Sequence, residues 1–391
     1  MDQELVSVLE GIKKDNIIIY GCGGYGEIAL RGLENLGMKP RYFLDRKFAG
    51  QNQWGVPVRM PEDGNIDQEA CYLVAVGNAH NEVCEFLQSK GCKHLYNLEE
   101  IFAMEMDTSV LSSKAEYFWV NKHLYYDYIH KPVKGEIFLH HLDFVTTEKC
   151  TLKCRDCAHL NQYYIHPADV DLDSSIAALD RMFMCIDYLS EIRILGGEPL
   201  INRECWKVVQ YISQQPKCGQ AVIYTNGTVL PDKKTLQCIK EGMAVLHVSN
   251  YGVRTEVINK NLAFYRENNC KLYNDVFDTW LDLGGIEKRD YEEDALQRIF
   301  DKCQMRKCLN FHGTKMYSCS RIGGLLNCGL LEDPAENRED EWVDFSGEIN
   351  PIEKREELKY LLNRKKPFES CRHCNGYFDA GKVPAGIQIA T

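Results

Sequence analysis

Three cysteines spaced Cys-x3-Cys-x2-Cys constrain this chain more than any other feature. Cys150, Cys154 and Cys157 come directly after an apolar alternating segment, residues 138–146, so they lie in a short loop at the end of a strand. Three thiolates in one short loop can occupy three corners of a cubane iron–sulfur cluster, which leaves one iron without a protein ligand. The spacing therefore indicates a cluster whose open iron binds a small molecule. A zinc or purely structural site is the alternative.

Strand and helix patterns alternate around and after this loop. Repeated strand–helix units favour a parallel sheet that closes, fully or partly, into a barrel. In such barrels the chemistry lies at the carboxyl ends of the strands, where the loops converge. We expect strands at 136–147, 192–195, 221–224, 244–249 and 271–274, and helices from a Ser174 cap to 186 and at 204–213, 233–240 and 256–267.

Polar and glycine-containing segments follow the next three strands as the cysteines follow the first. Four motif loops after four successive strands indicate one shared site. Because asparagine, serine and glycine are common turn residues, turn formation is the alternative for the last two loops. The three segments are Gly196-Gly197-Glu198-Pro199, Thr225-Asn226-Gly227 and Ser249-Asn250-Tyr251-Gly252.

These motifs resemble those of the radical S-adenosylmethionine superfamily. Cys150, Cys154 and Cys157 are similar to its cluster-binding signature, and Gly196 to Pro199 are similar to its GGEP motif. The resemblance implies a 4Fe-4S cluster whose open iron chelates S-adenosylmethionine. It also implies contacts from Gly196, Gly197, Glu198 and Pro199 to the methionine amino group. By the same resemblance, Thr225, Asn226, Ser249 and Asn250 lie near the ribose and carboxylate of that cofactor.

One residue departs from the family pattern. The position before the third cysteine is often aromatic or apolar in the family, where it helps to enclose the adenine, but here it is Asp156. An aspartate cannot stack on a base. The resemblance therefore predicts the cluster ligands but not the adenine contact.

The first hundred residues contain a glycine-rich turn between a strand and a helix. The pattern G-x-G-x-x-G at Gly21, Gly23 and Gly26 follows a strand at 16–20, and Asp45 ends the next strand. Such a turn suits a phosphate at a helix N-terminus, with the acidic residue on a ribose hydroxyl. The unit resembles small Rossmann-like domains attached to sugar-modifying enzymes. A nucleotide or nucleotide-sugar site is one interpretation, and a structural or partner-docking glycine turn is the other.

The last third of the chain is again rich in cysteine. A hairpin is expected around Gly313, and a Cys-x2-Cys pair at Cys371 and Cys374 comes much later, an arrangement typical of zinc or iron–sulfur sites. The region resembles the auxiliary-cluster domains called SPASM and Twitch. We expect Cys308, Cys319, Cys371 and Cys374 to hold one auxiliary 4Fe-4S cluster. Cys303 could replace Cys308, and structural zinc is the alternative occupant.

The expected architecture is an α/β chain in four parts. Residues 1–105 form a Rossmann-like domain, and residues 106–135, rich in aromatic side chains, form a helical linker. Residues 136–300 form a partial (β/α)6 radical S-adenosylmethionine barrel, and residues 301–391 form a small cysteine-rich extension of the SPASM/Twitch type.

Composition excludes some partners. The chain has 391 residues and a formal net charge of −11, without a basic run interleaved with aromatics, so nucleic acid is not an expected partner. No apolar run is long enough to span a bilayer, and residues 1–10 lack the pattern of a secretory signal. We therefore expect a cytoplasmic protein, and most of the scattered cysteines among its 18 act as small buried hydrophobes.

The resemblance implies an enzyme that cleaves S-adenosylmethionine with an electron from an external flavodoxin- or ferredoxin-type donor and then abstracts a hydrogen atom from a substrate. The Rossmann-like unit favours a carbohydrate or nucleotide-sugar substrate, with epimerase, dehydratase or oxidoreductase chemistry. Peptide maturation is the second hypothesis, since auxiliary clusters are frequent in peptide-modifying relatives. A non-catalytic iron–sulfur or zinc module is the third. The sequence does not identify a hydrogen-donor residue.

Overall fold

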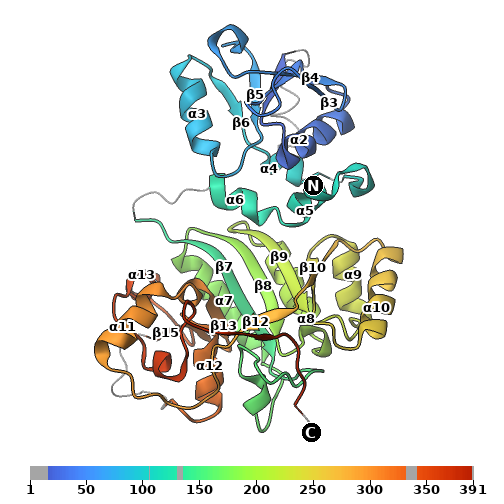
Figure 1. The fold of residues 1–391 in the computed structure, drawn as a ribbon. Coiled ribbons are helices and arrows are strands. Elements are labelled where there is room, and N and C mark those ends of the chain that lie inside the picture. Colours follow the sequence, from blue (N-terminus) through green and yellow to red (C-terminus); the bar gives the residue numbers. More distant parts are fainter. Residues whose placement is uncertain (1–15, 105, 130–134, 332–340, 390–391) are drawn as a thin grey trace. The chain divides into compact units, whose positions relative to one another are not determined.

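The computed structural model describes residues 16–104, 106–129, 135–331 and 341–389. The chain divides into two compact units, unit 1 (residues 1–131) and unit 2 (residues 132–391) (Figure 1). The amino-terminal residues 1–10, on which the expected lack of a secretory signal rests, lie outside the described residues.

Unit 1 is built on a sheet whose strands follow the order β3-β4-β2-β1-β5-β6, all parallel except the β3–β4 pair. Its central strand β1 is buried on both faces, because Ile17 and Ile19 pack in one core and Ile18 and Tyr20 in the other. Burial on both faces explains the continuous apolar run. The elements are β1 (Ile17–Tyr20), α2 (Gly24–Asn35), β2 (Tyr42–Leu44), β3 (Asn52–Gln53), β4 (Val56–Arg59), β5 (Cys71–Val74), α3 (His80–Ser89), β6 (His94–Tyr96), α4 (Glu99–Phe102), α5 (Ser113–Val120) and α6 (His123–Ile129).

The glycine turn after β1 is tightly packed at two of its three motif glycines. Gly21 has a φ of +105°, and a Cβ atom there would lie 2.4 Å from the Ala75 carbonyl oxygen. A Cβ atom at Gly26 would lie 2.2 Å from the Gly21 carbonyl oxygen, whereas one at Gly23 would meet nothing within 4 Å. The pattern G-x-G-x-x-G therefore reflects backbone packing at its first and last positions.

Asp45 fixes this turn to the loop that follows β2. Its Oδ2 accepts a hydrogen bond from the Cys22 backbone N–H at 2.9 Å, and its Oδ1 accepts from the Lys47 N–H at 2.8 Å. Both carboxylate oxygens thus have backbone donors inside the unit.

The aromatic segment expected as a linker is part of unit 1. Trp119, Tyr125 and Tyr126 are buried in its core beside Phe102, and the ring of Phe118 stacks on Tyr25 at 4.3 Å between centroids. The structure therefore places the boundary after residue 131 instead of residue 105. Large aromatic side chains bury enough area to join a segment to whichever core they contact.

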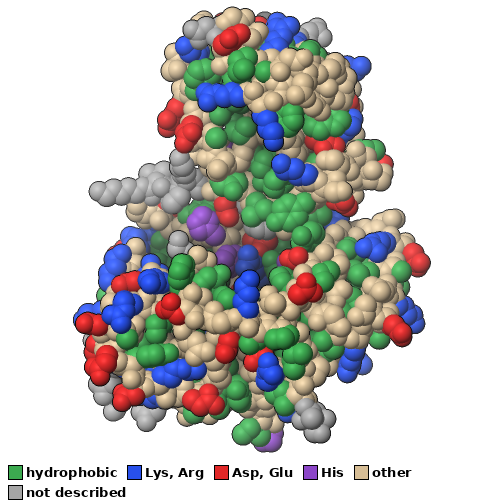
Figure 2. Space-filling model, viewed as in Figure 1, with side chains coloured by type: hydrophobic (Ala, Val, Ile, Leu, Met, Phe, Trp, Pro, Cys, Tyr) green, Lys and Arg blue, Asp and Glu red, His purple; other side chains and the backbone are tan. Residues whose placement is uncertain are grey.

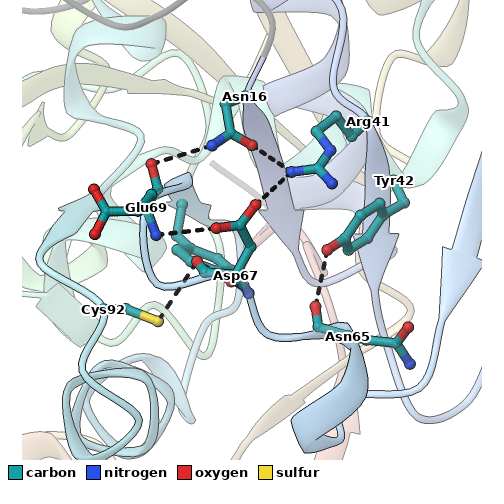
Figure 3. A network of polar contacts seen from close by, with 8 residues as sticks. Asn16, Arg41, Tyr42, Asn65, Asp67, Glu69 and Cys92 are labelled. Atoms are coloured by element: carbon teal, nitrogen blue, oxygen red, sulfur yellow. Dashed lines mark hydrogen bonds and ion pairs between the residues drawn. The ribbon is translucent and has the colours of Figure 1, made fainter.

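A polar network joins the segment before β5 to the first two strands (Figure 3). Arg41 donates to Asp67 Oδ2 at 2.6 Å and to Asn16 Oδ1 at 2.5 Å, and Asn16 donates to the Glu69 carbonyl at 3.1 Å. The hydrogen bond from Arg41 holds the pKa of the Asp67 carboxyl below its usual range. The network fixes the edge of the sheet at which β1 and β5 begin.

Unit 2 contains a sheet with the order β11-β10-β9-β8-β7-β13-β14-β15. The first six strands in this order are parallel, whereas β14 is antiparallel to its two neighbours, β13 and β15. Figure 1 shows α7 and α8 behind this sheet. The elements are β7 (Phe138–Thr147), α7 (Leu172–Cys185), β8 (Tyr188–Gly196), α8 (Cys205–Ser213), β9 (Cys218–Thr225), α9 (Lys233–Lys240), β10 (Val245–Asn250), α10 (Thr255–Glu267), β11 (Leu272–Val276), β12 (Thr279–Leu281), α11 (Glu293–Lys302), β13 (Leu309–His312), β14 (Lys315–Tyr317), α12 (Ser320–Asn327), β15 (Trp342–Asp344), α13 (Pro351–Asn363) and β16 (Lys382–Pro384).

Side chains of the parallel strands alternate between an apolar face and a polar face. On β7 and β8, Leu142, Phe144, Ile192 and Ile194 pack in the core with the helices, whereas Asp143 and Arg193 point to the opposite face. Strand geometry requires this alternation. A parallel sheet also brings all carboxyl ends to one edge, so the loops after β7, β8, β9 and β10 lie side by side.

The cysteine-rich region does not form a separate body. Strand β13 pairs with β7 in parallel, with Leu309 opposite Leu142, and β13 and β14 form the expected hairpin around Gly313. The expected division at residue 300 therefore falls inside unit 2.

No helix in the described part of the chain is long and apolar enough to cross a membrane. On the face of the molecule shown in Figure 2, basic and acidic side chains are interspersed, and no broad area carries basic side chains alone.

We predict that two glycine substitutions in unit 1 differ in their effect on stability. Gly26→Ala should destabilise the unit by a few kcal/mol (~2–4), because its Cβ would overlap the Gly21 carbonyl. Gly23→Ala should change stability by about 0.5 kcal/mol or less, because its Cβ meets open space. Hydrogen exchange of β1 and α2 in the full chain measures both effects, and equal exchange rates in the two variants would contradict the packing role of Gly26.

Candidate functional site

Cys150, Cys154 and Cys157 lie on the wall of one cavity of about 570 Å³ at the carboxyl ends of the parallel strands. Burial raises the pKa of the Cys150 thiol to about 12 and that of Cys154 to about 11. Within the described residues, no three His, Cys, Asp or Glu side chains converge on a point suited to a single metal ion. Thiolates that bind different irons of a cluster need no such common point.

The glycines after β8 let two loops meet backbone to backbone. Gly197 N–H donates to the Thr147 carbonyl and Glu198 N–H to the Lys149 carbonyl, both at 2.8 Å. A Cβ atom at Gly196 would lie 2.2 Å from the Thr147 oxygen, and one at Gly197 would lie 2.1 Å from the Lys149 oxygen. Any larger residue would push the cysteine loop away. This cradle fits a cluster held between the two loops.

Glu198 supports the cavity wall from behind. Its carboxylate accepts hydrogen bonds from the Thr225 hydroxyl and the Asn226 backbone N–H, both at 2.8 Å, and from the Leu200 N–H at 3.2 Å. Burial raises the pKa of this carboxyl to about 7. The Asn226 side chain in turn donates to Cys150 Sγ at 3.7 Å and to Thr151 Oγ1 at 3.0 Å.

The structure thus divides the residues expected around S-adenosylmethionine into two groups. Gly196, Gly197, Thr225, Asn226 and Ser249 line the cavity. Glu198, Pro199 and Asn250 are not among its lining residues: Pro199 begins a short buried 3-10 helix, and Asn250 Oδ1 accepts from the Gly252 N–H at 3.0 Å.

Aromatic side chains on the cavity wall come from the motif residue Tyr251 and from positions outside the motifs. Asp156 lies on the wall, and its Oδ2 accepts from Arg155 Nη2 at 2.8 Å. Tyr251 and Trp280 make an edge contact with ring centroids 4.7 Å apart, and Phe277 and Tyr377 line the same cavity. These rings supply the apolar surface that Asp156 lacks. Sequence reasoning missed Trp280 and Tyr377, which carry no local signal.

The segment 386–389 lies across the cysteine loop. Arg155 N–H donates to the Ile387 carbonyl at 2.8 Å, and Ile389 N–H donates to the Lys153 carbonyl at 2.9 Å. Gln388 Oε1 accepts from the Lys153 N–H at 2.8 Å, while its Nε2 donates to Cys154 Sγ at 3.2 Å. Hydrogen bonds to a ligand sulfur tune a cluster. Nothing in the sequence pointed to Gln388.

A second set of cysteines surrounds another cavity, of about 40 Å³. Its walls include Cys303, Cys319, Cys371 and Cys374. Burial, with smaller contributions from Cys374 and Cys303, raises the pKa of the Cys319 thiol to about 12, although Arg321 acts in the opposite direction. The structure therefore gathers three of the four cysteines expected at an auxiliary site, with Cys303 in the place expected for Cys308.

Cys308 faces elsewhere. Its Sγ lies 3.9 Å from Met305 Sδ, and its thiol pKa, raised to about 11 by burial, is also raised by the Asp143 carboxylate and lowered by Arg193. Asp143 and Arg193 belong to the polar face of the sheet. Cys308 directly precedes β13 and shares the inward side of Asn310, which explains its direction. Burial and the nearby Glu148 carboxylate raise the pKa of the Cys328 thiol.

Arg321 lines the second cavity and has hydrogen-bond donors without acceptors among the described residues. The side chain is buried, and Nη2 donates to the carbonyls of Gly284, Gly285 and His373 at 3.1, 2.6 and 3.0 Å. Its Nε and Nη1 groups are buried without a hydrogen-bond acceptor among the described residues. Buried cationic N–H groups require acceptors. An anionic group with exposed sulfides between the four cysteines would supply them, so the residues present fit an iron–sulfur cluster.

Comparison with known proteins agrees with the motifs. The chain is 29% identical over 144 residues to "GTP 3',8-cyclase" of Clostridium acetobutylicum, which is 37% of this chain and 43% of that protein. It is 33% identical over 85 residues to "Molybdenum cofactor biosynthesis protein moc-5" of Caenorhabditis elegans, which is 22% of this chain and 14% of that protein. The chain thus spans less than half the length of these curated relatives. No family model matches it.

Similar solved structures include BtrN in complex with AdoMet and 2-DOIA, at 15% identity and a TM-score of 0.38, covering 62% of this chain and 94% of that one. Streptococcus suis SuiB bound to S-adenosylmethionine gives 16% identity and a TM-score of 0.30, covering 59% of this chain and 51% of that one.

The cysteine loop, the glycine-rich strand end and the similarity to GTP 3',8-cyclases point to one class of protein. Over these segments the chain is similar to enzymes of the radical S-adenosylmethionine superfamily, in agreement with its motifs. Members of this superfamily are enzymes that bind S-adenosylmethionine at a 4Fe-4S cluster.

We predict that Cys303 and Cys308 differ in their effect on bound iron. Cys303→Ala should lower the iron content of the anaerobically reconstituted protein by about one cluster, because Cys303 lines the second cavity. Cys308→Ala serves as the matched control and should retain full iron. Iron and sulfide analysis measures both, and loss of iron in Cys308→Ala alone would restore the assignment expected from the sequence.

Proposed function

We propose that this chain reductively cleaves S-adenosylmethionine at a 4Fe-4S cluster held by Cys150, Cys154 and Cys157, and abstracts a hydrogen atom from a carbohydrate or nucleotide-sugar. The observation that carries the proposal is the meeting of these thiols with the loops after β8, β9 and β10 on one cavity wall. When bound, the cluster and its ligand supply electron transfer and a hydrogen-abstracting radical. A flavodoxin- or ferredoxin-type protein is the proposed electron donor.

The chain's own residues hold and enclose that chemistry. Gly196 and Gly197 bring the strand end against the cysteine loop, and Glu198 fixes Thr225 and Asn226 on the wall. Asn226 and Gln388 donate hydrogen bonds to ligand sulfurs. Aromatic rings on the wall lower the polarity of the site, and water excluded from such a site protects a reactive intermediate from side reactions.

We further propose that Cys303, Cys319, Cys371 and Cys374 hold an auxiliary 4Fe-4S cluster in a SPASM/Twitch-like region. Four cysteines around one cavity, with the unsatisfied donors of Arg321 beside them, support this occupant. Structural zinc is the alternative occupant, because zinc-bound thiolates also accept N–H hydrogen bonds.

The same proposal treats the sheet of unit 2 as a partial (β/α)6 barrel and unit 1 as a Rossmann-like domain. The strand order around β1 and the glycine turn after it support the second description. In unit 1 the glycine turn acts as a packing element, because a Cβ atom at Gly24 would lie 2.7 Å from the Phe118 ring and Asp45 already has backbone donors. Nucleotide binding at Gly21, Gly23, Gly26 and Asp45 is the alternative.

Anaerobic turnover tests the central proposal. Reconstituted protein with dithionite and S-adenosylmethionine should form 5′-deoxyadenosine, and Cys154→Ala should reduce the yield at least 100-fold because a cluster ligand is lost. UDP-glucose, as a representative nucleotide-sugar, should raise the yield if the substrate class is right. Formation of no 5′-deoxyadenosine by protein with full iron would favour a non-catalytic module.

Arg321 offers a test of the auxiliary site that does not depend on turnover. Arg321→Gln should lower the midpoint potential of the auxiliary cluster by on the order of 50–100 mV, because a buried cation stabilises the more negative reduced state. Arg306→Gln is the matched control: Arg306 lines the same cavity, but its guanidinium lies over Phe300 at 5.2 Å and is partly exposed. Potentiometric titration followed by electron paramagnetic resonance measures the midpoint potential of both variants. Equal potentials in Arg321→Gln and Arg306→Gln would refute the role of Arg321.

A further inference from the structure

A row of polar side chains crosses the inner face of the unit 2 sheet, two residues closer to the strand starts than the cavity wall. In the strand register Asn310 of β13 lies opposite Asp143 of β7, and Asp143 lies opposite Arg193 of β8. The next inward row contains Val145, opposite His312 on one side and Leu195 on the other. Leu195 lines the large cavity, and the polar row lies two residues further toward the strand starts on the same face, outside that lining.

Asp143 is a buried carboxyl whose charge is incompletely compensated. Its side chain is 7% exposed, and burial raises its pKa to about 6, although Arg193 acts in the opposite direction. The guanidinium of Arg193 donates to Glu191 Oε1 at 2.5 Å. Asp143 Oδ1 is buried and accepts no hydrogen bond from the described residues. A carboxylate oxygen left in this state is costly to the fold.

Asn310 presents the complementary group. It is 1% exposed, and its Nδ2 is buried without an acceptor among the described residues. The side chain lines a small cavity together with Val145, His312, Gly196 and Gly197. Gly196 and Gly197 also line the large cavity, so the two spaces adjoin. Neighbouring strands lie about 4.8 Å apart, which places the unsatisfied acceptor and the unsatisfied donor side by side.

We propose that Asp143 and Asn310 form a subsite for a ring hydroxyl of the substrate, an inference that rests on the proposed function and specifies its substrate class. A hydroxyl is both donor and acceptor at one atom. It donates to Asp143 Oδ1 and accepts from Asn310 Nδ2, so a single group satisfies both. Tyr224 lines the large cavity, and its ring lies beneath the Arg193 guanidinium at 5.4 Å, so it joins the polar row to the cavity wall.

Other ligand groups fit this pair less well. A phosphate or carboxylate would meet the charges of Asp143 and Glu191, which repel anions. An ammonium would satisfy Asp143 but has no lone pair for Asn310. A backbone peptide group carries its donor and its acceptor on opposite sides, so it cannot serve two adjacent partners from one atom. The pair therefore favours a hydroxyl over a backbone peptide group.

Equilibrium binding tests the subsite without turnover. The probes are UDP-glucose, glucosamine and myo-inositol, with tri-alanine as the peptide comparison, each measured by saturation-transfer NMR on reconstituted protein with S-adenosylmethionine bound. We expect at least one hydroxylated probe to bind, and Asp143→Leu and Asn310→Leu each to weaken it 10- to 100-fold. Asn274→Leu is the matched control and should change binding less than twofold. Asn274 lies two residues after Leu272 on β11, on the side of the sheet that packs against the helices.

Three results would overturn the subsite. The first is unchanged binding in both Asp143→Leu and Asn310→Leu, which would mean that the pair holds a buried water only. The second is binding of tri-alanine in place of the hydroxylated probes, and the third is binding of none of them. If a leucine variant fails to fold, Asp143→Asn replaces it; since Asn carries no charge to bury, its melting temperature at pH 8 should equal or exceed that of the wild type.

The failure of this inference is distinguishable from failure of the proposed function. Formation of 5′-deoxyadenosine by the wild-type protein reports on the cysteine loop alone. Dependence of probe binding on Asp143 and Asn310 reports on the subsite alone.

Discussion

The backbone contact between the cysteine loop and the end of β8 is the constraint on which the candidate site depends. Gly197 and Glu198 donate to carbonyls at Thr147 and Lys149, and both glycines sit where a single added carbon would overlap an oxygen. Once this contact is made, Glu198 can turn inward and hold Thr225 and Asn226. The loops after β7, β8 and β9 are therefore coupled through the buried Glu198 carboxylate and through two glycines, Gly196 and Gly197, whose lack of a side chain permits the contact.

The motif loops were predictable from the sequence because parallel strands with helical crossovers bring their carboxyl ends to one edge. Cys150, Cys154, Cys157, Gly196, Thr225 and Ser249 meet on one cavity wall for that reason. Local cap chemistry was less decisive: α7 begins at Leu172 with Asp171 as its cap, although Ser174 is an equally good cap residue in isolation. Both residues lie within one turn, so only the packing of the helix selects between them.

Long-range packing decided what the sequence could not. Cys303 and Cys308 are five residues apart and chemically identical, but Cys303 follows α11 and Cys308 precedes β13, so Cys303 lines the second cavity and Cys308 does not. The aromatic segment 113–129 has the composition of an interface and gives no sign of which unit it covers. Gln388 reaches Cys154 across 234 positions of sequence, and no local pattern marks it. Each of these assignments depends on residues far away in the chain.

The pairing of residues 386–389 with the cysteine loop has a consequence for synthesis. Strand β7 and the loop emerge from the ribosome long before Gln388, and at about 5–20 residues per second the 234 intervening positions take roughly 10–50 s to make. During that interval the three thiols lack the segment that covers them. Residues 386–389 can therefore pair with the cysteine loop only after every strand of the eight-stranded sheet has been made.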